Sequence, residues 1–215
     1  MKVIIFGNQE TAEIAKFYFE KDTGIRPVAF CVDRDYLRDC NKSGLPVIPS
    51  DEIATFFPPG DDCKFFVPVY DNFLRSQKMN WAKASGYELA SYLSSKSTIL
   101  SFDIGENSFI LENNVIQPFV SIGDGCILWS GNHIGHHSIL GNFVFMASHV
   151  VVSGKCKIES YSWLGVNSSL RDGICLAEGT FVGMNSCVIK DTKPYCKYFG
   201  IPAKEIGFVT SNSEK

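Results

Sequence analysis

The sequence lacks the marks of several large classes of protein. It has no run of 18 apolar residues, so we expect no membrane-spanning helix, and residues 1–6 lack the long apolar run of a signal peptide. A net charge of −3 at pH 7 argues against a nucleic-acid partner. The eight cysteines form no Cys-x-x-Cys pair, which disfavours a metal site built on them. We therefore expect a cytoplasmic protein without disulfides.

A six-residue period is present in the second half of the chain. Every sixth residue from Ile104 to Val188 is aliphatic, without exception, and four residues after each comes a small or modest side chain. This period fits neither a helix nor simple strand alternation, and requires one short strand and one corner in every six residues. Three such faces close a coil of about 18 residues, the hexapeptide form of the parallel β-helix. A β-sandwich with chance spacing is the alternative.

The first hundred residues alternate strand and helix patterns, which predicts an α/β domain with a small parallel, Rossmann-like sheet. We expect strands at Lys2–Phe6, 28–32, 46–48 and 64–69, a capped short helix at 51–54, and longer helices after Gln9 and Asn72. The domains are then 1–97 and 98–215, and we expect residues 210–215 to be disordered.

Ligands of such sheets bind at the carboxyl ends of the strands. Those ends carry three short polar segments, Gly7-Asn8-Gln9, Asp33-Arg34 and Asp71-Asn72. A single glycine, Gly7, does not make a G-x-G-x-x-G dinucleotide fingerprint, so we expect no NAD site. A loop such as Gly7-Asn8-Gln9, at a helix N-terminus, can still hold one phosphate group or the polar edge of a nucleotide base. The alternative is that Gly7 only makes the turn from strand to helix.

All four histidines lie inside the repeat and outside its inward aliphatic register: His133, His136, His137 and His149. One coil of 18 residues separates His136 from Gly154. A glycine stacked beside a histidine leaves a notch and an accessible backbone N–H, which suits acyl transfer with histidine as base and the N–H as oxyanion donor. One alternative is that these are solvated surface histidines. The other is a zinc site, but metal-dependent β-helix enzymes space their histidines more widely in the sequence than this chain does. We therefore expect no metal.

Three segments carry a family resemblance: VIIFG at 3–7, HIGHHSILGNF at 133–143 and FGIPAK at 199–204. The chain resembles bacterial nucleotide-sugar N-acetyltransferases and the related sialic acid O-acetyltransferases over nearly its whole length. The resemblance implies a Rossmann-like domain followed by a left-handed β-helix, a homotrimer with active sites between subunits, and acetyl-CoA as co-substrate.

The resemblance also implies residue roles. His136 matches the catalytic base, but Gly135 and His137 replace the acidic residues that usually flank it. Either another group, such as Asn132 or a residue of the adjacent subunit, orients His136, or the base is weak. Gly154 matches the backbone oxyanion donor. Asn132 and His137 are also expected on the substrate side.

The remaining matches concern the two substrates. The nucleotide-sugar contacts match Gly7, Asn8, Gln9, Asp33 and Arg34, although Asn8-Gln9 departs from the family's frequent Gly-Gly-His. The matching acetyl-CoA positions are Ser153, Gly154, Gly165, Val166, Gly183, Met184 and Lys190, with Pro202 and Ala203 near the adenine.

The resulting hypothesis is acetyl transfer from acetyl-CoA to the amine of a nucleotide-linked amino-deoxy sugar, in bacterial surface polysaccharide (O-antigen) biosynthesis. The alternatives are O-acetylation of a sugar hydroxyl, a non-catalytic nucleotide-sugar-binding trimer, and a zinc enzyme. The sequence leaves open the nucleotide base, the sugar and the position of its amine.

Overall fold

The computed structural model describes residues 1–60 and 62–209, which form two compact units. The front unit consists of Met1–Ser94 with Glu106–Ser108, and the second of Ser95–Gly105 with the described residues from Phe109 onward. The domain boundary after residue 97 stays a prediction, and the expected disorder of 210–215 lies outside the described residues. Within the described ranges, no helix has the length and apolar character to cross a membrane.

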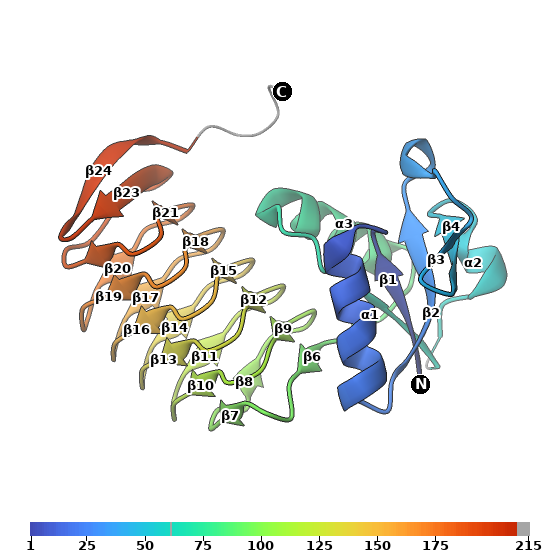
Figure 1. The fold of residues 1–215 in the computed structure, drawn as a ribbon, viewed down its shortest axis with the longest axis horizontal. Coiled ribbons are helices and arrows are strands. Elements are labelled where there is room, and N and C mark those ends of the chain that lie inside the picture. Colours follow the sequence, from blue (N-terminus) through green and yellow to red (C-terminus); the bar gives the residue numbers. More distant parts are fainter. Residues whose placement is uncertain (61, 210–215) are drawn as a thin grey trace. The chain divides into compact units, whose positions relative to one another are not determined.

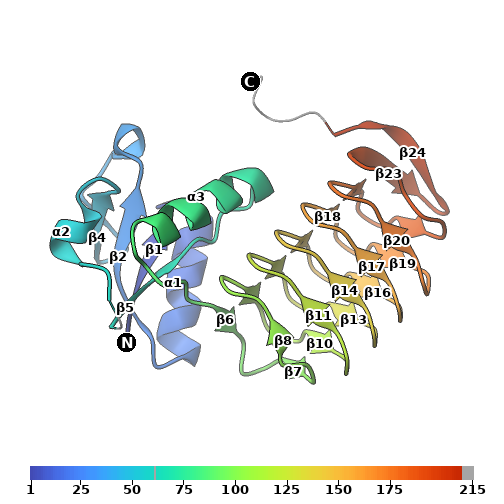
Figure 2. The ribbon, with the colours of Figure 1, turned by 180° about the vertical axis from the view of Figure 1, so that it is seen from behind.

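The front unit contains a five-stranded sheet in the order β3-β4-β2-β1-β5. Figure 1 labels β1 to β4, and Figure 2 labels β5. The strands are β1 (Lys2–Phe6), β2 (Arg26–Val32), β3 (Asn41–Lys42), β4 (Leu45–Pro49) and β5 (Cys63–Phe66). The pairs β1–β2, β1–β5 and β2–β4 are parallel, as predicted. A two-residue strand that was not predicted, β3, extends one edge of this sheet, because Ser43 and Gly44, with φ of 48° and 80°, form a turn that brings it antiparallel to β4.

Helices cover both faces of this sheet, α1 (Glu10–Asp22) on one and α3 (Asn72–Ala84) on the other (Figures 1 and 2). Asp71 caps α3 by accepting a hydrogen bond from the Leu74 N–H at 2.8 Å. The short helix α2 (Ile53–Phe56) begins two residues later than expected and has no side-chain cap. The capping prediction fails because the Asp51 and Glu52 carboxylates bind Arg34 instead. A short 3-10 turn, η1 (Arg34–Tyr36), follows β2. The short strand β6 (Tyr92–Leu93) comes last in the 1–94 segment.

The second unit is a parallel β-helix with three faces, coloured green to red in Figure 2. One sheet contains β7 (Thr98–Ile99), β10 (Val115–Ile116), β13 (His133–Ile134), β16 (Val151–Val152), β19 (Ser169–Leu170) and β22 (Cys187–Val188). The next contains β8 (Asp103–Ile104), β11 (Ser121–Ile122), β14 (Ile139–Leu140), β17 (Lys157–Ile158) and β20 (Cys175–Leu176). The third contains β9 (Phe109–Ile110), β12 (Ile127–Leu128), β15 (Phe145–Met146), β18 (Trp163–Leu164), β21 (Phe181–Val182), β23 (Cys196–Gly200) and β24 (Ala203–Phe208).

The six-residue period corresponds to the strands of this unit. Each two-residue strand from β8 to β22 ends on a residue of the aliphatic series, and paired strands are one coil apart, as in Ile116↔Ile134. The β-helix starts earlier than the series, because β7 turns Ile99 rather than Thr98 toward the core.

The glycines of the repeat are needed because the coils stack closely. A Cβ on Gly135 would lie 2.5 Å from the carbonyl carbon of Ser153, and one on Gly165 would lie 2.6 Å from the Met184 nitrogen. The left-handed residue that ends a corner is usually not glycine: asparagine holds this conformation at positions 107, 113, 167 and 185. Close approach between coils therefore explains glycine at positions 135 and 165, where the turn conformation does not require it.

Candidate functional site

We define the histidine edge as the stacked corner residues Pro118, His136, Gly154, Asp172 and Lys190. Each lies two residues after a strand of the β13 sheet and one coil from the next. Backbone hydrogen bonds join successive corners, from the Lys155 N–H to the His136 carbonyl at 2.9 Å and from the Gly173 N–H to the Gly154 carbonyl at 3.0 Å. The 18-residue coil thus aligns these five positions.

The imidazole of His136 is exposed and lies over Gly154. A Cβ on Gly154 would lie 2.8 Å from Cε1 and 3.0 Å from Nε2 of that ring. The backbone N–H of His136 donates to Oε1 of Gln117 at 2.8 Å, which fixes the start of the corner. The predicted juxtaposition of His136 and Gly154 is present, and the ring itself occupies the space that the absent side chain leaves.

His137 contacts His136 through its ring. The two Nδ1 atoms are 3.1 Å apart, and the ring planes are nearly perpendicular, at 86°. Phe119 packs against the ring of His137, and the centroids of these two rings are 4.7 Å apart.

Asn132, expected to orient His136 or contact substrate, does not contact His136 in this structure. Its side chain is buried in the inward register, where Nδ2 donates to the Trp129 carbonyl and Oδ1 accepts from the Val150 N–H at 2.7 Å. Because both ends of the amide are engaged inside the coil, Asn132 stabilises the corner rather than orienting His136, and its contact with substrate stays a prediction.

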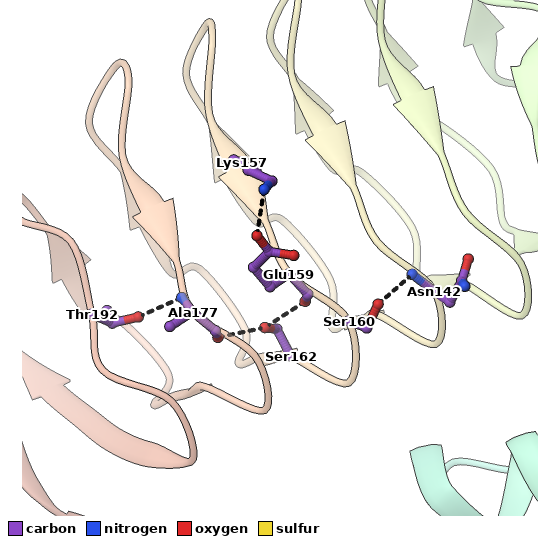
Figure 3. Close-up of polar contacts among 7 residues, drawn as sticks. All are labelled: Asn142, Lys157, Glu159, Ser160, Ser162, Ala177 and Thr192. Atoms are coloured by element: carbon purple, nitrogen blue, oxygen red, sulfur yellow. Dashed lines mark hydrogen bonds and ion pairs between the residues drawn. The ribbon is translucent and has the colours of Figure 1, made fainter.

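The Gly154 N–H, expected to be open for an oxyanion, is already bound. It donates to Oδ1 of Asp172 at 2.8 Å, one coil further on. The same kind of bond recurs at another corner, where the Asn142 N–H donates to Oγ of Ser160 at 3.0 Å (Figure 3). Asp172 therefore joins neighbouring coils, and the oxyanion role predicted for Gly154 conflicts with this bond.

The positions expected to bind acetyl-CoA fall on two edges of the β-helix. Ser153, Gly154 and Lys190 lie on or beside the histidine edge, whereas Gly165-Val166 and Gly183-Met184 lie at the corner that precedes the β13 sheet. Val166 is 44% exposed and Met184 68%. Pro202 lies exposed in the turn between β23 and β24, and Ala203 packs against the core. The two groups thus flank opposite borders of one sheet.

An open cleft of about 490 Å³ adjoins the histidine pair, one to two coils earlier along the β-helix. Leu100, Phe102, Pro118 and Phe119 supply its apolar walls, and Phe119 is the residue that packs against His137. Sequence reasoning missed this cleft, since Leu100 and Phe102 precede the regular period.

The front unit places its candidate residues at the carboxyl ends of β1 and β2. Gly7, with φ of 93°, follows β1, and its N–H donates to the Cys31 carbonyl at 2.7 Å. Asn8 and Gln9 then lead into α1, and Asp33 follows β2. The structure thus groups Gly7, Asn8 and Asp33 at one edge of the sheet, as the strand pattern predicts.

Arg34 is less available for a ligand than expected. Its guanidinium binds Asp51 at 2.7 Å and Glu52 at 2.5 Å, and this pairing holds the pKa of the Asp51 carboxyl below its usual range. Lys78, which sequence reasoning missed, reaches the same edge from α3. Its ammonium lies 2.6 Å from Asp33 and 5.2 Å from the centroid of the Phe6 ring. Only the pairing of strands and helix brings Lys78 and Asp33 together.

Over the part of the chain that the structure describes, no group of three or more histidine, cysteine or acidic side chains is arranged to hold a metal ion. Burial raises the pKa of the Cys31 thiol to about 12, so this cysteine at the end of β2 stays protonated near neutral pH.

Comparisons with known proteins agree with this architecture. The family model described as bacterial transferase hexapeptide (six repeats) matches residues 103–136. An acyl-[acyl-carrier-protein]–UDP-N-acetylglucosamine O-acyltransferase from Pseudomonas aeruginosa is 27% identical over 108 residues, which cover 47% of this chain and 42% of that protein. The chain thus spans less than half the length of the curated relatives it matches.

Two solved structures are similar over nearly the full length. PerB from Caulobacter crescentus, in complex with CoA and GDP-perosamine, has a TM-score of 0.86 at 22% identity, covering 96% of this chain and 98% of that one. The acetyltransferase domain of PglB from Neisseria gonorrhoeae, in complex with acetyl coenzyme A, has a TM-score of 0.83 at 21% identity, covering 95% and 98%. At these identities, the similarity confirms the expected fold: an α/β unit followed by a hexapeptide-repeat parallel β-helix.

Proposed function

We propose that this chain is an acetyl-CoA-dependent N-acetyltransferase that acts on the amine of a nucleotide-linked amino-deoxy sugar, in the synthesis of bacterial surface polysaccharide. One observation carries the proposal. An exposed imidazole, His136, lies over a glycine one coil away and is held by a second ring on a β-helix edge. The folds shared with a CoA and GDP-perosamine complex and with an acetyl-CoA complex support the two substrate classes.

The proposed reaction needs one base and one leaving thiolate. The sugar amine attacks the thioester carbonyl carbon, a C–N bond forms, and the C–S bond breaks to release CoA thiolate. Nε2 of His136 accepts the amine proton, because it is the ring nitrogen that does not contact His137. Gly154 contributes by having no side chain, which is the role its geometry supports, since Asp172 holds its N–H.

The two substrates would bind through different units. We assign the nucleotide to Gly7, Asn8, Gln9, Asp33 and Lys78 at the carboxyl edge of the front sheet, where ligands of such sheets bind. For acetyl-CoA we propose the two edges that border the β13 sheet.

A homotrimer is part of the proposal for acetyl-CoA binding. It would align the histidine edge of one subunit with the edge carrying Val166 and Met184 of a second copy, so that both line one groove. Light scattering after size exclusion should then give the mass of three 23.9 kDa chains.

The test is thiol release from acetyl-CoA across a panel of nucleotide-linked sugars that carry an amine or only hydroxyls. We expect release with an amino sugar and a loss of about 10²–10⁴-fold in kcat for His136→Asn. Tyr161→Asn is the control, because Tyr161 lies at the corner between β17 and β18, which does not border the β13 sheet, and asparagine holds the same left-handed conformation at other corners. Release with hydroxyl acceptors alone would indicate O-acetylation, and absence of acetyl-CoA binding would indicate a non-catalytic protein.

A further inference from the structure

The histidine pair raises the question of what holds the proposed base in a reactive form. Two Nδ1 atoms 3.1 Å apart can form a hydrogen bond only when one carries a proton and the other does not. The tautomer of one ring therefore decides the tautomer of the other. Among the described contacts of the His136 side chain, no carboxylate takes part.

The backbone at position 137 does not require a histidine. His137 has φ of 59°, and asparagine fills the equivalent conformation at four other corners of this chain. In its own stacked column, two coils further on, the residue is Gly173, with φ of 71°. The imidazole of His137 is thus not explained by the corner, and it is fixed by Phe119, whose ring centroid is 4.7 Å away.

Resting on the proposed function, we infer that His137 is the positioning residue for His136. The neutral His137 ring accepts the Nδ1–H of His136, which leaves Nε2 of His136 unprotonated over Gly154. When Nε2 takes the amine proton, the Nδ1–H of the resulting imidazolium donates more strongly to His137, because a charge-assisted hydrogen bond is stronger than a neutral one. The opposite arrangement, with His137 as donor, would place the proton on Nε2 of His136 and block the base.

The test uses three substitutions that suit a left-handed backbone. His137→Gly removes the ring without strain, while His137→Asn and His137→Asp restore an oxygen at the position of Nδ1. For His137→Gly we expect kcat to fall about tenfold, the low end of what a hydrogen bond to a charged group contributes, with the KM for acetyl-CoA changed less than twofold. His137→Asn should recover most of the loss, and His137→Asp should match or exceed the parent protein.

The matched control is Tyr161→Gly, since Tyr161 has φ of 63°, glycine follows it by one coil at position 179, and its corner, between β17 and β18, does not border the β13 sheet. It should retain parental kcat. A His137→Gly variant with parental kcat, or asparagine and aspartate variants as slow as the glycine variant, would overturn the inference.

Nitrogen-15 NMR of the imidazoles gives a readout that does not depend on turnover. In the parent protein, His136 should carry its proton on Nδ1, and in His137→Gly it should shift toward the Nε2–H form. A parent His136 protonated on Nε2 would refute the positioning role. Inactivity of the parent on every acceptor would instead refute the proposed function, with the NMR result still deciding the role of His137.

Discussion

Gly154→Ala is a substitution that should separate catalysis from folding. The added Cβ would lie 2.8 Å from Cε1 of His136, whereas carbon atoms in contact are about 3.5 Å apart or more. The imidazole must therefore retreat by about 0.7 Å. Because the three nearest atoms all belong to one exposed side chain, the ring can move without displacing backbone.

The expected cost follows from that displacement. A misplacement of about 1 Å in a reacting group can cost about 10²-fold in rate, so we expect kcat to fall by about 10²-fold in the thiol-release assay. The melting temperature should change by less than about 2 °C, because 1 kcal/mol corresponds to about 2–4 °C for a chain of this length.

Gly135→Ala is the contrasting variant. Its Cβ would lie 2.5–2.7 Å from backbone atoms of Ser153 and Gly154, so the coils must separate and the melting temperature should drop by several times more. If Gly154→Ala retained parental kcat, the ring of His136 would not be the base. A large loss of melting temperature in Gly154→Ala would refute the view that only the imidazole moves.

Three further predictions concern Asp172, Lys78 and Tyr87. Asp172→Ala removes the acceptor of the Gly154 N–H. We expect a melting temperature a few degrees lower and a kcat within threefold of the parent value. A tenfold rise in kcat would instead show that the freed N–H stabilises the oxyanion. Lys78→Met removes the cation paired with Asp33. Calorimetry should show nucleotide-sugar binding about tenfold weaker, with the KM for acetyl-CoA unchanged. Unchanged affinity for the nucleotide sugar would contradict its assignment to this edge of the sheet. Burial raises the pKa of Tyr87 from 10 to about 12. The unfolded chain therefore loses the phenol proton at a lower pH than the folded protein does. The stability that this group contributes below pH 10 is then lost as the pH rises to about 12. Tyr87→Phe should therefore flatten the decline of the urea midpoint over that interval, and an unchanged slope would contradict the burial effect.

The β-helix was predictable because its geometry repeats. Every inward position meets the same environment, so Ile116 and Ile134, one coil apart, carry the same kind of side chain. The stacking of Gly154 on His136 follows from the same 18-residue arithmetic. The six-residue series itself does not reach β7, because the inward residue there is Ile99, one position later than the series would place it.

The parts of the site that failed prediction depend on side-chain direction or on distant pairing. The amide of Asn132 and the carboxylate of Asp172 each satisfy a neighbouring coil, which the spacing alone does not show. Lys78 reaches Asp33 only through the packing of α3 on the sheet. His137 was expected to contact substrate, and its contact with the neighbouring ring depends on the rotamers of two adjacent residues.

The most direct measurement is identification of the product formed from acetyl-CoA and a nucleotide-linked amino sugar by the parent protein and by His136→Asn. We predict one acetyl group on the amine nitrogen with the parent, formed about 10²–10⁴-fold more slowly by the variant, and at the parental rate by Tyr161→Asn. Equal rates for the parent and His136→Asn, or no acetylated product with any amino sugar, would contradict catalysis by His136 at this edge.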